Sequence, residues 1–349
     1  MKNRVSIKDI AQQAGVSHST VSRALQGTGR MSEETRARII ELAEEMGYTP
    51  DALAQSLVRG STRTVGVVVT TIADPFVAGI VAGIEEVAGR AGYTVLLGAS
   101  HMNPDREIEV VENLRQRRVD AVIVTASRVG DHYGEHLQRF GVPIVLVNNM
   151  VEGEYLYAIT CDQTNGAYRA TTHLLSLGHQ RIAYIGSSFR QHSSRMRRAG
   201  YEAALAAEGV PVDPALIIAP QAQRDVEVGQ AALKALWPLK PTAILAYNDL
   251  TAIGVMMAAR EMGVCIPQEL SLVGFDDIEA TQFVTPPLTT VHQPREAMGR
   301  AAMQMVLDIL HQKAIHNRKL DCELVIRDST SAASHLSPSG DTPSIEHVA

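Results

Sequence analysis

Two groups of polar side chains in this sequence have the types and spacing needed for molecular recognition. The first lies in residues 6–27, which read SIKDIAQQAGVSHSTVSRALQG. Here His18, Ser19 and Arg23 follow Ser17, a residue type that often caps the start of a helix. An arginine can donate to both O6 and N7 of a guanine, which discriminates against other bases by roughly 1–3 kcal/mol. This group is therefore suited to contacting DNA.

A helix-turn-helix is the element that would present these side chains. Apolar residues recur at helical spacing on each side of Gly15, at Ile7, Ile10, Ala11 and Ala14 and then at Val21, Ala24 and Leu25. A third stripe over 39–46, between Ser32 and Gly47, predicts a third helix. Any small helical hairpin can show such stripes. However, residues 1–30 carry five basic residues and one acidic residue, a net charge of +4 in a chain of net charge -6, which favours DNA binding at this end.

The second group stands directly after predicted strands. Asn248 follows Ile244–Tyr247, and Asp276 follows Leu272–Phe275. Ligands of α/β proteins bind beyond the carboxyl ends of the sheet strands, so these side chains are placed to bind a small molecule. The alternative for Asp276 is a simple turn residue. We interpret the neighbouring acids as a helix N-cap, Asp249, and a loop acid, Asp277.

Alternating strands and helices from residue 64 onward would position this second group. Strands are expected at 65–69, 95–97, 121–124 and 144–147, and again near 181–186, 215–218, 242–247 and 271–275. Helices are expected at 75–90 and near 104–117, 131–140, 163–177, 194–208, 226–236 and 249–262. This alternation predicts an α/β fold with parallel sheets. Because the series occurs twice, it predicts a two-lobed body with a cleft between the lobes.

Several motifs in this order resemble the lactose-repressor (LacI/GalR) family of transcription regulators. They are IKDIAQQAGVSHSTVSRAL, SEETRARI, AEEMGYTPDALAQSL, RTVGVVV, DPF, YNDLTAIG, SLVGFDD and PPLTTVHQP, and they span residues 5 to about 330. The resemblance implies a small all-α helix-turn-helix head and a two-lobed body like a periplasmic binding protein. In that fold the chain crosses between the lobes three times, here near 161, 291 and 321.

The expected domains follow from these patterns together. They are a helix-turn-helix head at 1–49, a hinge helix and linker at 50–63, and an effector-binding and dimerisation body at 64–330. Within the body, lobe 1 comprises 64–160 and 292–320, and lobe 2 comprises 161–291 and 321–330. The polar residues 331–349 have no apolar period and are predicted to be disordered. They also lack the leucine heptads that assemble tetramers, so a homodimer is expected.

The resemblance assigns DNA contacts to the head and the hinge. Its base-reading positions are His18, Ser19 and Arg23. Phosphate contacts or helix caps are expected at Ser6, Ser17, Thr20 and Arg30. For Ser6 and Ser17 the alternative is capping alone, although the two roles can coexist. Leu57 matches a hinge leucine that wedges into the minor groove, and its alternative is burial against the body.

Effector contacts are implied in both lobes. Asp276, Asn248 and Arg197 match the family's Asp, Asn and Arg, a set suited to sugar hydroxyls. Further matches are Asp74, Phe76 and Asp162. The alternative for Asp74, which precedes Pro75, is a helix N-cap, and the alternative for Phe76 is a core residue.

Two departures from the family pattern leave the effector's identity open. Asn148 and Asn149 stand where relatives often show Asp-Arg, and Arg224 stands where many sugar-binding members show an aromatic residue. Together with Arg197 and Arg128, Arg224 would suit a sugar acid or sugar phosphate, whereas a solvated loop residue is the slightly favoured alternative. A neutral sugar or sugar derivative is expected first, a sugar acid second, and a purine or other non-sugar third.

Other protein classes fit poorly. The N-terminus has no apolar signal segment, and no apolar run approaches the roughly 20 residues of a membrane span. The three cysteines are widely spaced and odd in number, which argues against disulfides and a zinc site. No P-loop, G-x-G-x-x-G, nucleophile elbow or H-E-x-x-H occurs, so we expect no catalytic residues, cofactor or metal. A transport-type or cytoplasmic solute-binding protein is the alternative, and the basic head disfavours it.

The sequence therefore predicts a cytoplasmic, homodimeric transcription regulator with no membrane partner, and a repressor rather than an activator. It is expected to bind a pseudo-palindromic operator in double-stranded DNA. A small molecule between its lobes is expected to control that binding.

Overall fold

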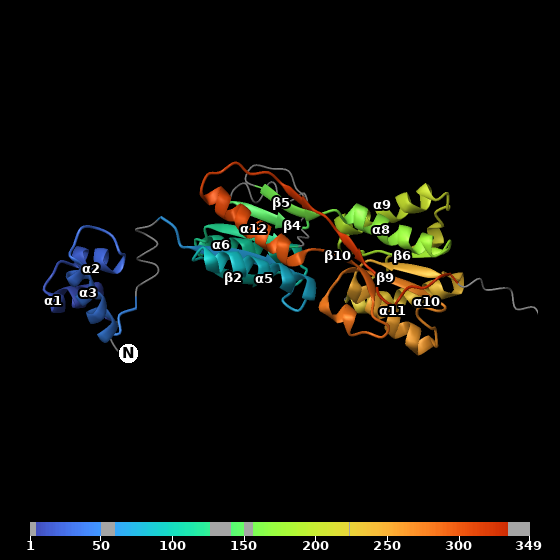
Figure 1. Ribbon diagram of the computed structural model, residues 1–349, viewed down its shortest axis with the longest axis horizontal. Coiled ribbons are helices and arrows are strands. Elements are labelled where there is room, and N and C mark those ends of the chain that lie inside the picture. The colour runs from blue at the N-terminus through green and yellow to red at the C-terminus, as the bar shows by residue number, and fades with distance from the viewer. Residues whose placement is uncertain (1–4, 50–59, 126–140, 150–155, 223, 334–349) are drawn as a thin grey trace, which may run out of the picture. The chain divides into compact units, whose positions relative to one another are not determined.

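The computed structural model describes residues 5–49, 60–125, 141–149, 156–222 and 224–333. The chain forms two compact units, Met1–Thr62 and Arg63–Ala349 (Figure 1). Leu57 and the rest of the expected hinge helix lie outside the described residues, as do Arg128 and the helix expected at 131–140. In the described part of the chain, no helix is long and apolar enough to cross a membrane.

The first unit contains the predicted three-helix head. Its helices are α1 (Ile7–Ala14), α2 (His18–Leu25) and α3 (Glu33–Glu45). Each contributes a fully buried residue to a small core: Ile10, Val21 and Ile39. Gly15 joins α1 to α2 with a φ of 69°, a left-handed conformation that is cheap for a residue without a Cβ atom. The helix-turn-helix prediction is confirmed.

The second unit begins with a six-stranded sheet, which defines lobe 1. Its strands are β1 (Thr64–Val69), β2 (Thr94–Ala99), β3 (Ala121–Thr125), β4 (Ile144–Val147), β5 (Leu156–Cys161) and β11 (Arg318–Leu320), in the spatial order β11-β5-β4-β3-β1-β2. All of these pairings are parallel. Helices α5 (Pro75–Arg90), α6 (Pro104–Gln116) and α12 (Arg295–Leu310) accompany the sheet.

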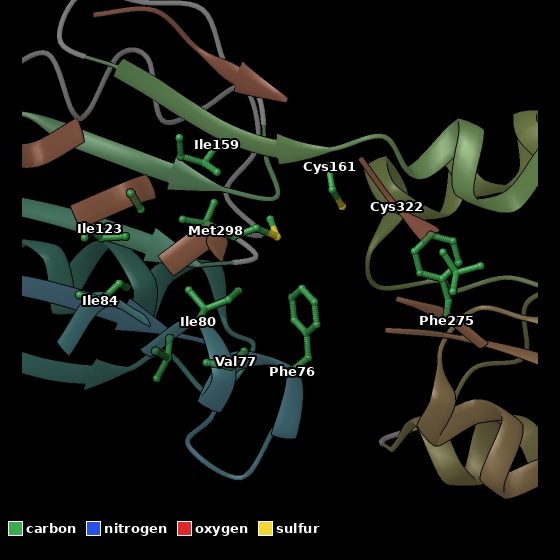
Figure 2. Close-up of a cluster of buried hydrophobic side chains, with 14 of the residues drawn as sticks. Phe76, Val77, Ile80, Ile84, Ile123, Ile159, Cys161, Phe275, Met298 and Cys322 are labelled. Atoms are coloured by element: carbon green, nitrogen blue, oxygen red, sulfur yellow. The ribbon is translucent and has the colours of Figure 1, made fainter. Parts of the chain in front are cut away.

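Alternation along β1 shows how the sheet of lobe 1 is buried on both faces. Val67 belongs to a core cluster with Ile80 of α5 and Met298 of α12, which Figure 2 shows beside Ile123 and Ile159 of the sheet. Val68 instead belongs to a second cluster beneath α6. Strands covered on both faces read as continuous apolar runs, which explains why VGVVV was recognisable as a strand.

A second six-stranded sheet defines lobe 2. Its strands are β6 (Ile182–Ile185), β7 (Ile217–Ile218), β8 (Ala243–Ala246), β9 (Ser271–Asp276), β10 (Thr289–His292) and β12 (Glu323–Val325), in the order β12-β10-β9-β8-β6-β7. Its helices are α8 (Gln163–Ser176), α9 (Gln191–Ala207), α10 (Asp225–Leu236) and α11 (Asp249–Met262). Short 3-10 turns span Pro214–Leu216, Trp237–Leu239 and Glu279–Gln282. The predicted fold class is confirmed, with one difference among the described strands: β12 runs antiparallel to β10.

The chain passes between the two sheets three times (Figure 1). The passages lie between β5 and α8, between β10 and α12, and between β11 and β12. Beyond them, Ser331 and Ala333 were expected to be disordered, and this was wrong. The backbone N–H of Ser331 donates to Ser271 Oγ at 3.0 Å, and that of Ala333 donates to the Leu177 carbonyl at 2.8 Å. These bonds fix the described end of the chain to lobe 2.

Candidate functional site

The head presents a polar face at the start of α2. Ser17 Oγ accepts from the backbone N–H of Thr20 at 3.2 Å, and it lies 2.8 Å from the hydroxyls of both Ser19 and Thr20. His18 and Arg23 are exposed on the same helix. A helix N-terminus carries unpaired N–H groups and partial positive charge, and this hydroxyl cluster lies at that end of α2.

Ser6 and Arg30 flank this helix pair. The Ser6 backbone N–H and hydroxyl both donate to Asp9 Oδ2, at 2.8 and 2.7 Å, so Ser6 is a helix cap in the structure. Both hydrogen bonds lower the pKa of Asp9, and the bond from the Ser6 backbone N–H has the larger effect. Arg30 is exposed beyond α2. The side chains of His18, Arg23 and Arg30 are therefore exposed on the head, and Ser6 and Ser17 fix the starts of α1 and α2.

In the second unit, one arginine joins polar residues of the two lobes. Arg190, just before α9, lies 3.3 Å from Asp74 Oδ2 of lobe 1 and 2.8 Å from Asp225 Oδ2 of lobe 2. Asp225 Oδ2 also accepts from Asn248 Nδ2 at 2.9 Å. We call Asp74, Arg190, Arg197, Asp225, Asn248 and Asp276 the inter-lobe cluster.

Arg197 is the most enclosed cation of the inter-lobe cluster. Its side chain is only 4% exposed. Its guanidinium lies over the Phe275 and Tyr247 rings, 3.8 and 4.5 Å from their centroids. It also donates to Gln163 Oε1 at 2.9 Å and to the Tyr247 carbonyl. This places it at a fixed position 3.6 Å from Asp276 Oδ1.

Close helix packing brings Arg197 to this position. One turn along α9, a Cβ atom added to Gly200 would lie 2.1 Å from the Thr164 carbonyl oxygen of α8. Only glycine allows the two helices to approach so closely. The RMRRAGY motif therefore encodes the guanidinium and the contact that positions it.

Asp276 ends β9 in a buried position. Its Oδ1 accepts from Gln293 Nε2 at 2.5 Å, and its φ is 119°. Burial raises the pKa of Asp276 to about 6, while nearby Arg197 opposes the rise. Asp249, one strand away, is fully buried and hydrogen-bonded to the Ile278 backbone and to Thr290, and burial raises its pKa well above the usual value.

Helix capping explains the local geometry of two cluster residues. Asp74 Oδ1 accepts from the Phe76 N–H at 3.0 Å and caps α5. Asn248 Oδ1 accepts from the Thr251 N–H at 2.9 Å and caps α11. The sequence analysis gave that cap to Asp249, which was wrong because Asp249 is the first residue inside the helix. Asp74 and Asn248 each retain a second polar atom that faces Arg190 or Asp225.

Of the other predicted effector residues, Arg224 and Asp162 lie outside the inter-lobe cluster, and Phe76 and Asn148 lie beside it. Phe76 belongs to a buried cluster that includes residues of both lobes, among them Phe275, and its side chain is 8% exposed (Figure 2). Arg224 pairs with Glu227 at 2.8 Å with its side chain 79% exposed, so the structure does not bring it to the inter-lobe cluster. Asp162 caps α8 and lies 2.6 Å from Lys319 Nζ. Asn148 lies near the cluster, since its Nδ2 donates to Gln293 Oε1 at 3.4 Å.

Sequence reasoning missed Arg190, Asp225 and Gln293. Arg190 follows β6 by five residues, and Asp225 opens α10, so each lies near a strand end or a helix start. That position was a usable signal, but their pairing depends on the tertiary fold. Among the described residues, no three His, Cys, Asp or Glu side chains gather to hold a metal ion.

Comparison with known sequences gives matches along nearly the whole chain. The family profile described as bacterial regulatory proteins, lacI family, matches residues 6–51, and the profile of the periplasmic binding protein-like domain matches residues 171–330. The HTH-type transcriptional repressor CytR of Escherichia coli (strain K12) is 36% identical over 332 residues, which cover 94% of this chain and 96% of that protein.

Solved structures agree with these matches. The lac repressor dimer bound to operator and the anti-inducer ONPF superposes with a TM-score of 0.85 at 27% identity, covering 95% of this chain and all of the other. A LacI family regulator from Enterococcus faecium with bound ribose gives a TM-score of 0.70 at 29% identity, covering 78% of this chain and all of the other.

Proposed function

The chain belongs to the lacI family of bacterial regulatory proteins, and we propose that a neutral, hydroxyl-rich molecule at its inter-lobe cluster controls its affinity for operator DNA. It is an effector-binding transcriptional repressor rather than an enzyme. The effector proposed is a sugar or a sugar derivative such as a nucleoside.

The charge balance of the inter-lobe cluster carries this proposal. It holds two guanidiniums and three carboxylates, and each guanidinium already has a carboxylate within 3.6 Å. An anionic effector would therefore meet no unpaired positive charge there. Of the residues that favoured a sugar acid, Arg224 is solvated and paired with Glu227, Arg197 is paired with Asp276, and Arg128 lies outside the described residues. Hydroxyl groups, in contrast, both donate to carboxylates and accept from guanidinium and amide N–H groups.

The similar ribose-bound structure supports the same class of ligand. In our proposal, Asp276, Asn248 and Arg197 contact the effector from lobe 2 and Asp74 contacts it from lobe 1. Arg190 and Asp225, which the sequence analysis did not include, join them. Asp162 is left out of the contact set because it pairs with Lys319, and Arg224 because it is exposed and pairs with Glu227. Phe76 is as buried as Asp276 and lies beside Asp74, so it stays a proposed lobe 1 contact.

For the head, we propose that a homodimer places two copies of α2 in successive major grooves of a pseudo-palindrome. His18, Ser19 and Arg23 would read base edges, and Ser17, Thr20 and Arg30 would contact phosphates. Leu57 would enter the minor groove between the half-sites. The domain boundaries given above are part of this proposal.

For the effector to control the affinity for operator DNA, it must bind two arrangements of the lobes with different affinities. The lobes are joined by three chain passages, so a ligand that bridges Asp74 and Asp276 would shift their relative orientation. Linkage then requires DNA to change the effector's affinity by the same factor by which the effector changes that of DNA.

A thermal-shift screen tests the effector class. The panel contains D-ribose, D-glucose, cellobiose, the common ribonucleosides, gluconate, ribose 5-phosphate and free purine bases. A ligand at 100 times its dissociation constant stabilises the native state by about 2.7 kcal/mol, which is readily seen. We expect stabilisation by a neutral sugar or nucleoside. Stabilisation only by gluconate or ribose 5-phosphate would contradict the charge-balance argument.

A further inference from the structure

The last residue of β9 and the residue after it adopt an unusual backbone conformation. Asp276 and Asp277 have φ values of 119° and 55°, both in the left-handed region. Residues with a Cβ atom rarely enter this region, and they remain there only when the surrounding structure holds them. We call this pair the 276–277 turn. It bears the carboxylate that stands opposite Arg197.

Four side chains hydrogen-bond to the second residue of the turn, and the longest of these bonds runs from Thr281 Oγ1 to Asp277 Oδ1 at 3.5 Å. The Asp277 carboxylate accepts from Arg327 Nη2 at 2.7 Å and from His292 Nδ1 at 2.9 Å. The Asp277 carbonyl accepts from Arg295 Nη2 at 2.8 Å. Although burial raises the pKa of Asp277, the bonds from His292 and Arg327 bring it to about 2, so this carboxylate is ionised throughout the neutral range.

Arg327 is also held in place by hydrogen bonds to residues other than Asp277. Its Nη1 donates to the Leu288 carbonyl at 2.8 Å and to Thr281 Oγ1 at 3.0 Å, and its side chain is only 16% exposed. Its backbone N–H donates to Thr289 Oγ1 at 3.0 Å. A guanidinium held at this many points is a rigid fork, unlike the surface arginines whose pairs are worth little.

We propose that the Asp277–Arg327 ion pair is a positioning device for effector recognition, which holds the 276–277 turn so that the Asp276 carboxylate stays beside Arg197 and Gln293. In the structure, Asp276 Oδ1 lies 2.5 Å from Gln293 Nε2 and 3.6 Å from Arg197 Nη2. Arg327 and Asp277 act through Asp276. This inference rests on the proposed function, because it takes Asp276 as an effector contact.

Substitutions at Asp277 separate positioning from ordinary stabilisation. Glycine adopts a φ near 55° without steric cost, whereas alanine does not, and both remove the carboxylate. If the ion pair holds the turn, Asp277→Ala should raise the effector dissociation constant at least tenfold. The increase caused by Asp277→Gly should be at least five times smaller than the increase caused by Asp277→Ala. Arg327→Met should behave like Asp277→Ala. Adding Asp277→Gly to Arg327→Met should recover most of the loss.

The binding measurement is calorimetry of the full chain with whichever neutral compound of the panel (D-ribose, D-glucose, cellobiose or a ribonucleoside) stabilises the wild-type protein most. Arg198→Met is the matched control, because Arg198 forms an exposed pair with Glu202 on the same lobe. Operator affinity without ligand should stay within twofold of wild type for every variant. Equal losses for Asp277→Gly and Asp277→Ala would overturn the proposal, since a purely structural ion pair predicts equality.

A second measurement does not depend on the effector class. Crystal structures of the ligand-free wild type and Arg327→Met should show the turn relaxed in the variant and Asp276 Oδ1 beyond hydrogen-bond distance from Gln293. An unchanged turn would overturn the proposal. If no neutral sugar or nucleoside of the panel binds the wild type, the proposed effector class fails, while the crystal structures still decide the positioning role. If Arg327→Met does not fold, the structures of Asp277→Gly and Asp277→Ala decide it in the same way.

Discussion

The raised pKa of Asp276 predicts that effector binding depends on pH. Burial brings the pKa of this carboxyl to about 6, so lowering the pH from 8 to 5 converts most of the free protein to the protonated form. A neutral ligand does not titrate in this range. Its hydroxyls donate to the ionised carboxylate, whereas the protonated form offers a competing donor. The affinity should therefore be complete above the pKa and be lost below it.

The magnitude follows from the ionised fraction. With a pKa of about 6, that fraction is about 99% at pH 8 and about 9% at pH 5, so the dissociation constant should rise about tenfold. Calorimetric titrations with the stabilising sugar or nucleoside at half-unit pH steps measure this profile. In Asp276→Asn, binding should be weaker at pH 8 by roughly 1.5–3 kcal/mol, the usual worth of a hydrogen bond to a charged group, and flat with pH.

The titration of two histidines, the half-buried His173 and the buried His179, must be distinguished from that of Asp276. Burial lowers the pKa of His173 and of His179, which bond to Thr330 and to Thr242 and Ser271. None of these residues belongs to the inter-lobe cluster. A wild-type profile that is flat between pH 5 and 8, or a slope that persists in Asp276→Asn, would refute the reasoning.

Three further predictions follow from the same geometry. Arg23→Ala should reduce discrimination among operator variants by roughly 1–3 kcal/mol while changing non-specific binding much less, as competition gel shifts would measure; equal losses would make Arg23 a phosphate contact. Arg224→Ala should leave the effector dissociation constant within twofold of wild type in calorimetry, and a larger change would return Arg224 to the site. Without ligand, Asp276→Asn should melt at a higher temperature than wild type at pH 7. The reason is that the raised pKa of Asp276 makes its buried charge cost about 1–3 kcal/mol of the free energy of unfolding. Calorimetric scans should show this difference in melting temperature shrinking toward pH 5, where wild-type Asp276 is protonated.

Local signals made the head predictable from sequence. Ser17 and Ser32 cap α2 and α3, and Gly15 takes the left-handed turn, each within three or four residues of its partner. Such interactions depend on short stretches of chain, so apolar spacing and cap residues suffice to place them. Strands β1, β3, β4 and β9 of the body were equally visible, because burial on both faces makes them continuous apolar runs. Strands β5 and β10 were not predicted.

Short strands and long-range pairs could not be read in this way. Two strands, Arg318–Leu320 and Glu323–Val325, are too short and too polar to show an alternating pattern of apolar residues. They form because they pair with β5 and β10, respectively. Asp276 and Asn248 were found because they follow strands. Arg190 meets Asp74 across 116 positions of sequence, and that approach is set by the packing of two lobes.

The central claim is that a ligand at the inter-lobe cluster controls operator binding. Its most direct test is the operator dissociation constant, measured by fluorescence anisotropy with and without the stabilising sugar or nucleoside, for wild type and Asp276→Ala. The operator is selected beforehand from random duplexes with the wild-type protein. We predict that the ligand changes the wild-type constant by the same factor by which operator changes the ligand's constant, and that Asp276→Ala keeps its free operator affinity within twofold but loses the response. A normal response in Asp276→Ala would contradict the account.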